Sequence, residues 1–145
     1  MSREVYPLVV PRLQFGGQCA EALELYQKVF GATVKEKILF SQANPSDFQY
    51  MGKEKDHFIY YAELMIGKHM VMMHDDVSGT AFNSRHGATA LCVSFGSEEK
   101  ARAAYELLLD GASILMPITS TSYGVFEVSL ADKFGIVWDL YFGDA

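Results

Sequence analysis

The sequence predicts an α+β fold built from two copies of a βαβββ module. The main observation is a repeat at a separation of 80 residues, in which Phe15-Gly16 recurs as Phe95-Gly96 and Gly31-Ala32-Thr33 recurs as Gly111-Ala112-Ser113. One helix-length segment lies inside each copy, and strand-like segments follow it. A repeated unit that cannot bury its own sheet must pack against the other copy, so the repeat also limits where a pocket can form.

Composition and charge are those of an ordinary globular protein. The chain has 145 residues, of which 50% are hydrophobic and 21% are charged, enough for one domain with a core. The net charge is −6 and the basic residues are dispersed, so no nucleic-acid partner is expected. No apolar run approaches the length of a membrane span and the N-terminal segment lacks a signal-peptide core, so we expect no membrane partner and a cytoplasmic location. The two cysteines, Cys19 and Cys92, form no Cys-x-x-Cys motif and are expected to be free thiols.

The first module is expected over about residues 5–76. It opens with a strand, Tyr6–Phe15, whose two prolines indicate an edge or a bulge. A helix over Cys19–Phe30 has its apolar residues on one face and ends before Gly31, where a left-handed cap would lie. A long polar loop and three strands with alternating or β-branched patterns complete the module. The loop is Ser41–Asp56, and the strands are Thr33–Phe40, His57–Ile66 and His69–Asp75.

The second module is expected over about residues 86–143, after a polar linker at Asp76–Gly87. It opens with a strand over Ala88–Phe95, followed by a helix over Glu98–Asp110 that Ser97 can cap. Gly111 ends the helix, and three further strands follow. They are Ala112–Ile118, Val125–Leu130 and Ile136–Phe142. Residues 1–145 are thus expected to form a single domain of two modules.

Four stretches of the chain carry family motifs. They are Leu13–Ala32, Ala62–Gly67, Gly111–Pro117 and Asp132–Trp138. On these residues the chain resembles PhnB-like proteins of the vicinal oxygen chelate superfamily, which also contains glyoxalase I, bleomycin-resistance proteins and extradiol dioxygenases. The resemblance implies a glyoxalase-like arrangement, in which the sheets of the two modules curl around a shared cavity. It also implies a homodimer, and leaves open whether the modules pair within one chain or between two.

Strand alternation then indicates which side chains face the cavity, because neighbouring residues of a strand point to opposite sides of the sheet. The apolar residues are assigned to the helix side, so the polar residues between them converge on the other side, as they do in many ligand sites. A sheet with one solvated face would give the same pattern. Glu63 and Glu127 are expected at equivalent places in the two modules. The predicted catalytic residues are Glu63, Glu127 and Asp139, and the predicted substrate-binding residues are Arg12, Gln14, Tyr61, His69, Cys92 and Tyr141.

The resemblance also allows a test for a metal site, since metal-dependent members place one ligand on each of four strands. Two of these positions fall near Val10 and Val71, which cannot bind a metal ion. The third falls near Ala88, with His86 two residues earlier, and the fourth is Asp139, whose counterpart in the first module is taken to be Val71. A catalytic metal usually needs three protein ligands. We therefore predict no metal site and no cofactor, while a metal bound through His86 or Asp139 stays open.

The leading interpretation is a PhnB-like protein that binds a small organic ligand in the cavity between its modules. The reaction, and whether the protein is an enzyme at all, stay open; a carboxylate could act as general base and Arg12 could steer an anionic substrate. An alternative is a non-catalytic dimer of the bleomycin-resistance type, whose inward carboxylates suit a cationic ligand. A metal-dependent lyase or dioxygenase and a structural dimer without ligand are the remaining alternatives.

Overall fold

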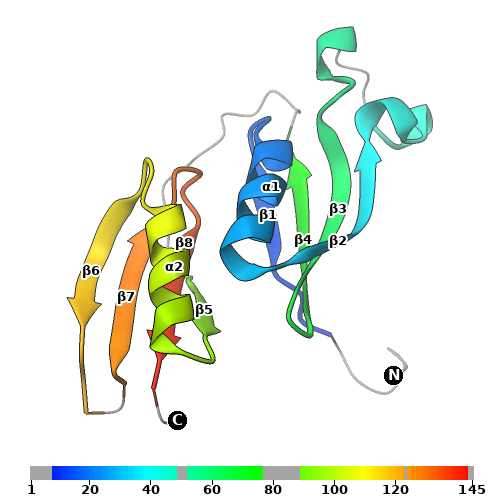
Figure 1. Cartoon of the computed structure of the whole chain (residues 1–145). Coiled ribbons are helices and arrows are strands. Elements are labelled where there is room, and N and C mark those ends of the chain that lie inside the picture. The colour runs from blue at the N-terminus through cyan, green and yellow to red at the C-terminus, as the bar shows by residue number, and fades with distance from the viewer. Residues whose placement is uncertain (1–7, 49–51, 77–88, 123, 144–145) are drawn as a thin grey trace. The chain divides into compact units, whose positions relative to one another are not determined.

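The computed structural model describes residues 8–48, 52–76, 89–122 and 124–143 (Figure 1). A strand, a helix and three strands occur twice in succession, which confirms the predicted α+β fold with two βαβββ modules. The chain divides into two compact units, described separately below. Unit 1 comprises Met1–Leu23 and Gly31–Ala81, and unit 2 comprises Glu24–Phe30 and Phe82–Ala145.

The sheet of the first module has the strand order β1-β4-β3-β2. Strand β1 runs parallel to β4, while β3 is antiparallel to both β4 and β2. The connection from β1 to β2 contains helix α1, seen beside β1 and β4 in Figure 1. The elements are β1 (Arg12–Phe15), α1 (Cys19–Phe30), β2 (Thr33–Leu39), β3 (Ile59–Ile66) and β4 (His69–Asp75).

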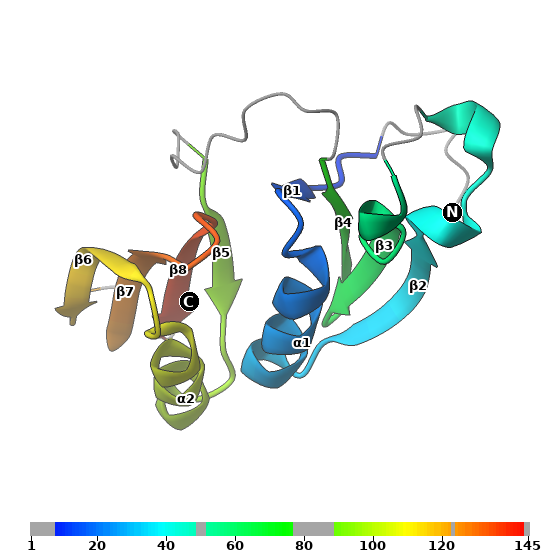
Figure 2. The same ribbon diagram turned by 90° about the horizontal axis from the view of Figure 1, so that it is seen from above.

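The sheet of the second module repeats this topology with the order β5-β8-β7-β6. Strand β5 is parallel to β8, and β7 is antiparallel to β8 and β6. Helix α2 lies across one face of this sheet, as Figures 1 and 2 both show. The elements are β5 (Leu91–Ser94), α2 (Glu98–Leu108), β6 (Ser113–Thr119), β7 (Phe126–Ala131) and β8 (Val137–Phe142).

The predicted apolar faces of β3, β7 and β8 are buried. In β3, Ala62 and Leu64 are fully buried, whereas Tyr61 and Glu63, which alternate with them, are not. Strands β7 and β8 of unit 2 alternate in the same way over most of their length and with larger side chains. The buried residues of this face are Phe126, Val128, Leu130, Trp138 and Leu140, and Ala131 and Val137 at the strand ends are buried as well. Burial of such side chains is the main favourable contribution to folding.

The ends of the two helices follow the sequence signals. Gly31 after α1 adopts a left-handed conformation with φ of 64°, which a residue with a side chain adopts only at a cost. Ser97 caps α2 by accepting a hydrogen bond from the backbone N–H of Lys100 at 3.1 Å. None of the helices in the described part of the chain has the length and apolar character that crossing a membrane requires.

Most of the strands and helix α2 begin or end one to three residues away from the predicted bounds, and the start of β1 differs more. Strand β1 begins at Arg12 rather than at Tyr6, and the described residues Leu8–Pro11 form no strand. Pro11 has no N–H to donate, and its carbonyl oxygen instead accepts the first bond of the ladder, from the backbone N–H of Met72 at 2.9 Å. The predicted loop Ser41–Asp56 contains short 3₁₀ turns among its described residues. The linker beyond Asp76 lies outside the described residues.

Candidate functional site

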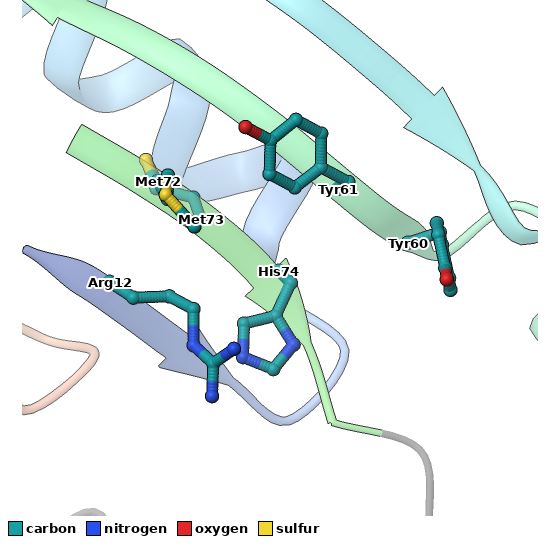
Figure 3. Close-up of a pocket in the computed structure, with 6 residues that line it drawn as sticks. All are labelled: Arg12, Tyr60, Tyr61, Met72, Met73 and His74. Atoms are coloured by element: carbon teal, nitrogen blue, oxygen red, sulfur yellow. The ribbon is translucent and has the colours of Figure 1, made fainter. Parts of the chain in front are cut away.

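A pocket of about 290 Å³ lies on one face of the unit 1 sheet (Figure 3). It is on the side opposite to helix α1, which Figure 3 shows behind the strands. Strands β1, β3 and β4 all contribute residues to its wall, among them a guanidinium, an imidazole, two phenol rings and the thioether of Met72. The residues that line it are Arg12, Tyr60, Tyr61, Met72, Met73 and His74.

The strand register explains why these residues meet. Arg12 on β1 is paired with Met72 on β4, and Met72 is paired with Glu63 on β3. Paired residues of neighbouring strands lie on the same face of a sheet, where their side chains can touch. Gln14 and His74 form the next pair along β1 and β4. Five residues from three strands are thereby brought to one face.

The imidazole of His74 has an unsatisfied nitrogen at this pocket. Its Nε2 atom is buried and has no hydrogen-bond partner within the part of the chain that the structure describes. Burial lowers the pKa of His74 below its ordinary value of 6.5, and the positive charge of Arg12 lowers it further. A hydrogen bond with the Asp75 backbone and the charges of Asp76 and Asp75 act in the opposite direction without reversing the shift.

The strand end that carries His74 is fixed by its neighbour Asp75. The carboxylate is 2% exposed and accepts three backbone hydrogen bonds, from the N–H groups of Gly17 at 2.8 Å and of Cys19 and Ile59 at 2.9 Å. Cys19 is the first residue of α1, and the preceding Gln18 provides no side-chain cap. Asp75 therefore satisfies the free N–H groups at the start of this helix from another element.

The remaining polar residues of this face are bonded to one another. The Tyr61 hydroxyl donates a hydrogen bond to the carboxylate of Glu63, and Gln14 Nε2 donates to Asp76 at 2.9 Å. Glu63 is half-buried beside the pocket and does not line it. Of the residues that the sequence singled out, the structure thus brings Arg12 and Tyr61 into the pocket wall, with Glu63 and Gln14 alongside.

The sequence-based face assignment of β4 is wrong by one residue. His69 was expected to face the site, but strand alternation places this exposed residue with the buried residues Val71 and Met73, on the face opposite to Arg12. His74 lies on the pocket face and was missed. Both faces of β4 carry apolar side chains, so the strand offers no polar alternation that could have fixed its orientation.

Unit 2 carries a second polar face. Cys92 on β5 is paired with Asp139 on β8, which is paired with Ser129 on β7, and Tyr141 is paired with Glu127 in the next row. Partial burial and the charges of Asp139 and Glu127 raise the pKa of the Cys92 thiol. The Oε2 atom of Glu127 is buried and accepts no hydrogen bond from the described residues.

These registers correct which residues of the two modules are equivalent. Arg12 and Cys92 occupy the same place in the 80-residue repeat. The row of paired residues that starts at Arg12 reaches Glu63, whereas the row that starts at Cys92 reaches Ser129. The counterpart of Glu63 is therefore Ser129, and the expected equivalence of Glu63 with Glu127 is wrong.

The same rows of paired residues correct one of the predicted metal positions. The counterpart of Asp139 is Met72 rather than Val71, so the first module offers a thioether where the second has a carboxylate. His86 lies outside the described residues. Within the described ranges, no group of three or more His, Cys, Asp or Glu side chains is placed to hold a metal ion.

Comparison with known proteins identifies the family. A family model described as the glyoxalase/bleomycin resistance protein/dioxygenase superfamily matches residues 10–140. The chain belongs to this superfamily. Protein YjdN of Escherichia coli K12 is 31% identical over 139 residues, which cover 88% of this chain and 90% of YjdN.

Two solved structures share the fold of this chain. Protein PA1353 from Pseudomonas aeruginosa superimposes with a TM-score of 0.80 at 24% identity, covering 97% of this chain and all of PA1353. A PhnB protein from Bacillus cereus gives a TM-score of 0.77 at 22% identity, covering 93% of this chain and 98% of that protein. Both likenesses show that this chain has the same fold as these proteins.

Proposed function

We propose that this superfamily member binds a small organic ligand in the unit 1 pocket, the cavity lined by the six residues of Figure 3. The observation that carries the proposal is the make-up of the wall, in which the polar groups of Arg12, His74 and the two tyrosines converge beside the apolar surfaces of the tyrosine rings and Met72. Such a combination is typical of small-molecule sites, where apolar contacts provide affinity and the polar groups set orientation. Whether the polar face of unit 2 completes one shared cavity with this pocket stays a prediction.

Each part of the wall has a role in this proposal. Arg12 forms no ion pair with any described residue, so its guanidinium N–H groups are available to a ligand. Tyr60 and Tyr61 offer flat apolar surfaces, and Met72 offers a flexible thioether that adapts to ligand shape. Glu63, held by the Tyr61 hydroxyl beside the pocket, is the group that we assign as proton acceptor in any reaction of the bound ligand.

A second candidate function is binding of a cationic group at the polar face of unit 2. The unpartnered Oε2 atom of Glu127 favours it, because a buried carboxylate oxygen without a donor is costly and a ligand ammonium would supply one. Asp139 on the neighbouring strand adds a further negative charge. This candidate corresponds to the non-catalytic, sequestering alternative, and Glu127→Gln should weaken binding of an alkylammonium probe.

The test of the leading proposal is a fragment screen followed by NMR on protein labelled at the methionine methyl groups. Fragments of all charge types should be included, and some are expected to shift the Met72 and Met73 signals. Met72→Trp should fill the pocket and weaken their binding about tenfold or more, because Met72 lines the cavity.

Met70→Trp is the matched control, since Met70 lies on the same face of the same strand, is also half-buried, and does not line the pocket. The proposal fails when no fragment shifts the Met72 signal, or when Met70→Trp weakens binding as much as Met72→Trp.

A further inference from the structure

We propose that the ligand of the unit 1 pocket carries an oxyanion held jointly by Arg12 and His74, and that His74 takes up a proton when the oxyanion binds. The inference rests on the proposed function and names the class of its ligand. A carboxylate and a phosphate share the required chemistry, and the experiment below distinguishes them.

The geometry places two nitrogen-bearing groups at the same point of the wall. Figure 3 shows the guanidinium of Arg12 beside the imidazole ring of His74, with both side chains on the same side of the sheet. They come from neighbouring parallel strands, β1 and β4, and both line the cavity. An oxyanion can accept hydrogen bonds from both, and bonds between charged groups are the stronger kind.

The acidic groups around His74 already have donors. Asp75 accepts hydrogen bonds from three backbone N–H groups on the opposite face, and Asp76 accepts a hydrogen bond from the side-chain amide of Gln14. Across from β4, the carboxylate of Glu63 accepts the Tyr61 hydroxyl. Arg12 has no carboxylate of a described residue within ion-pair distance. The charged and titratable groups that surround His74 are thus Arg12, Tyr60, Tyr61, Glu63, Asp75 and Asp76.

The protonation step follows from the two ring nitrogens of His74. A hydrogen bond with the Asp75 backbone favours the protonated ring, and the buried Nε2 atom has no hydrogen-bond partner among the described residues. A neutral ring that donates through Nδ1 presents a lone pair at Nε2, and this lone pair repels an oxyanion. When a proton from solvent adds to Nε2, the ring becomes an imidazolium whose new N–H donates to the oxyanion. No bond of the ligand breaks in this step.

The direction of the pH dependence follows from the charges. Without ligand, burial and Arg12 hold the pKa of His74 below 6.5. A bound oxyanion adds a negative charge next to the ring, and this favours the imidazolium and raises the pKa. Between the two pKa values, binding is accompanied by proton uptake, so affinity falls by up to about tenfold per pH unit as pH rises. Above the higher value, affinity no longer depends on this proton.

Four probes of one shape but different charge test the inference. Benzoate and phenyl phosphate carry the two kinds of oxyanion, benzamide is neutral and benzamidine is cationic. Binding is followed by NMR through the Met72 methyl signal and the ring signals of His74. Benzoate is used for the pH series because its carboxyl group stays ionised over about pH 5.5–8.5. The tighter of benzoate and phenyl phosphate identifies the preferred oxyanion.

The expected result is that both anions bind the pocket at least tenfold more tightly than benzamide and benzamidine. Benzoate affinity should fall as pH rises in the wild-type protein, while the His74 ring titrates at higher pH with benzoate than without it. Arg12→Met should weaken benzoate binding about tenfold, because the guanidinium no longer donates to the carboxylate. His74→Gln should remove the pH dependence, because the amide can donate but does not titrate in this range. His57→Gln is the matched control, since His57 is exposed and does not line the pocket, and it should retain the wild-type profile.

Two results overturn the inference. One is binding of benzamide or benzamidine at the pocket as tight as that of the anions; the other is benzoate binding whose pH dependence is absent or survives in His74→Gln. In both cases compounds still bind the pocket, so the proposed function stands. A complete lack of binding, in this series and in the fragment screen, would overturn the inference and the proposed function together.

Discussion

Asp75 couples three segments of the first module through one buried carboxylate. Its partners Gly17 and Cys19 lie 58 and 56 residues away in the sequence, and Ile59 begins the neighbouring strand β3. No local pattern signals such long-range partners, and the sequence His74-Asp75-Asp76 resembles an ordinary polar turn. The buried role of Asp75 therefore could not be predicted from sequence.

We expect Asp75→Ala to lower the free energy of unfolding by about 3 kcal/mol or more, because two buried N–H groups and one part-buried N–H group lose their acceptor at once. Asp75→Asn should cost less, since the amide keeps one acceptor oxygen. Urea denaturation followed by circular dichroism measures both effects. The control is Asp76→Asn, one residue further along and partly exposed, which should change stability by less than about 1 kcal/mol. Equal losses at the two positions would contradict this account.

The two thiols should differ in reactivity. Burial, followed by the charge of Asp75, raises the pKa of Cys19, which is fully buried, whereas Cys92 is exposed. A disulfide reagent should therefore label only Cys92 in the folded protein and both thiols in urea.

Asp139→Asn should accelerate labelling of Cys92 at pH 7 by about twofold or more, because a lower thiol pKa leaves more thiolate. An unchanged rate, or the same acceleration in the exposed control Asp110→Asn, would refute the pairing of Cys92 with Asp139.

Among the elements, those with a strong local signal were predicted best. The predicted bounds of α1 are those observed, because a regular apolar stripe and a glycine cap define them. The buried faces of β7 and β8 were assigned correctly, since polar and apolar residues alternate over most of both strands. Strand β4 lacks this alternation, so its orientation depends on pairing with β1 and β3, which the sequence does not reveal.

The glycines after the two helices make a matched pair for testing the turns. Gly31 and Gly111 both have positive φ, of 64° and 74°, but a Cβ at Gly31 would meet nothing within 4 Å. At Gly111 the added Cβ would lie 2.8 Å from the Cβ of Lys133. Gly31→Ala should lower the free energy of unfolding by about 1 kcal/mol through backbone strain alone. Gly111→Ala should lower the free energy of unfolding by about 2 kcal/mol or more, because it adds the crowding at Lys133 to the backbone strain. If urea denaturation gave the same loss for both variants, the crowding at Lys133 would contribute nothing.

For the whole molecule, we predict a homodimer, as is common in the superfamily. Strand β6 is an edge strand of the unit 2 sheet, and Ile114, Leu115 and Ile118 on it are all about two-fifths exposed. Unpaired edges with exposed apolar side chains are favoured places for association. Light scattering coupled to size exclusion should give twice the chain mass of 16.2 kDa.

Leu115→Lys should shift this dimer towards monomer. Leu107→Lys on α2 is the control, because Leu107 and Leu115 are both 45% exposed and only Leu115 lies on the edge strand. A wild-type monomer would contradict the predicted dimer. Dissociation of the control as well would contradict the assignment of the interface to β6.

The alternation of β4 has a practical consequence for engineering this chain. Positions 70, 72 and 74 lie on the pocket face and are half-buried, while Val71, Met73 and Asp75 are buried in the core and at the start of α1. A library randomised only at the three even-numbered positions would vary the pocket wall at 72 and 74 and the neighbouring surface at 70, and would keep the core intact. A library that also included the odd-numbered positions would yield mostly unfolded variants, so selectivity can be redesigned along one strand by respecting its two-residue period.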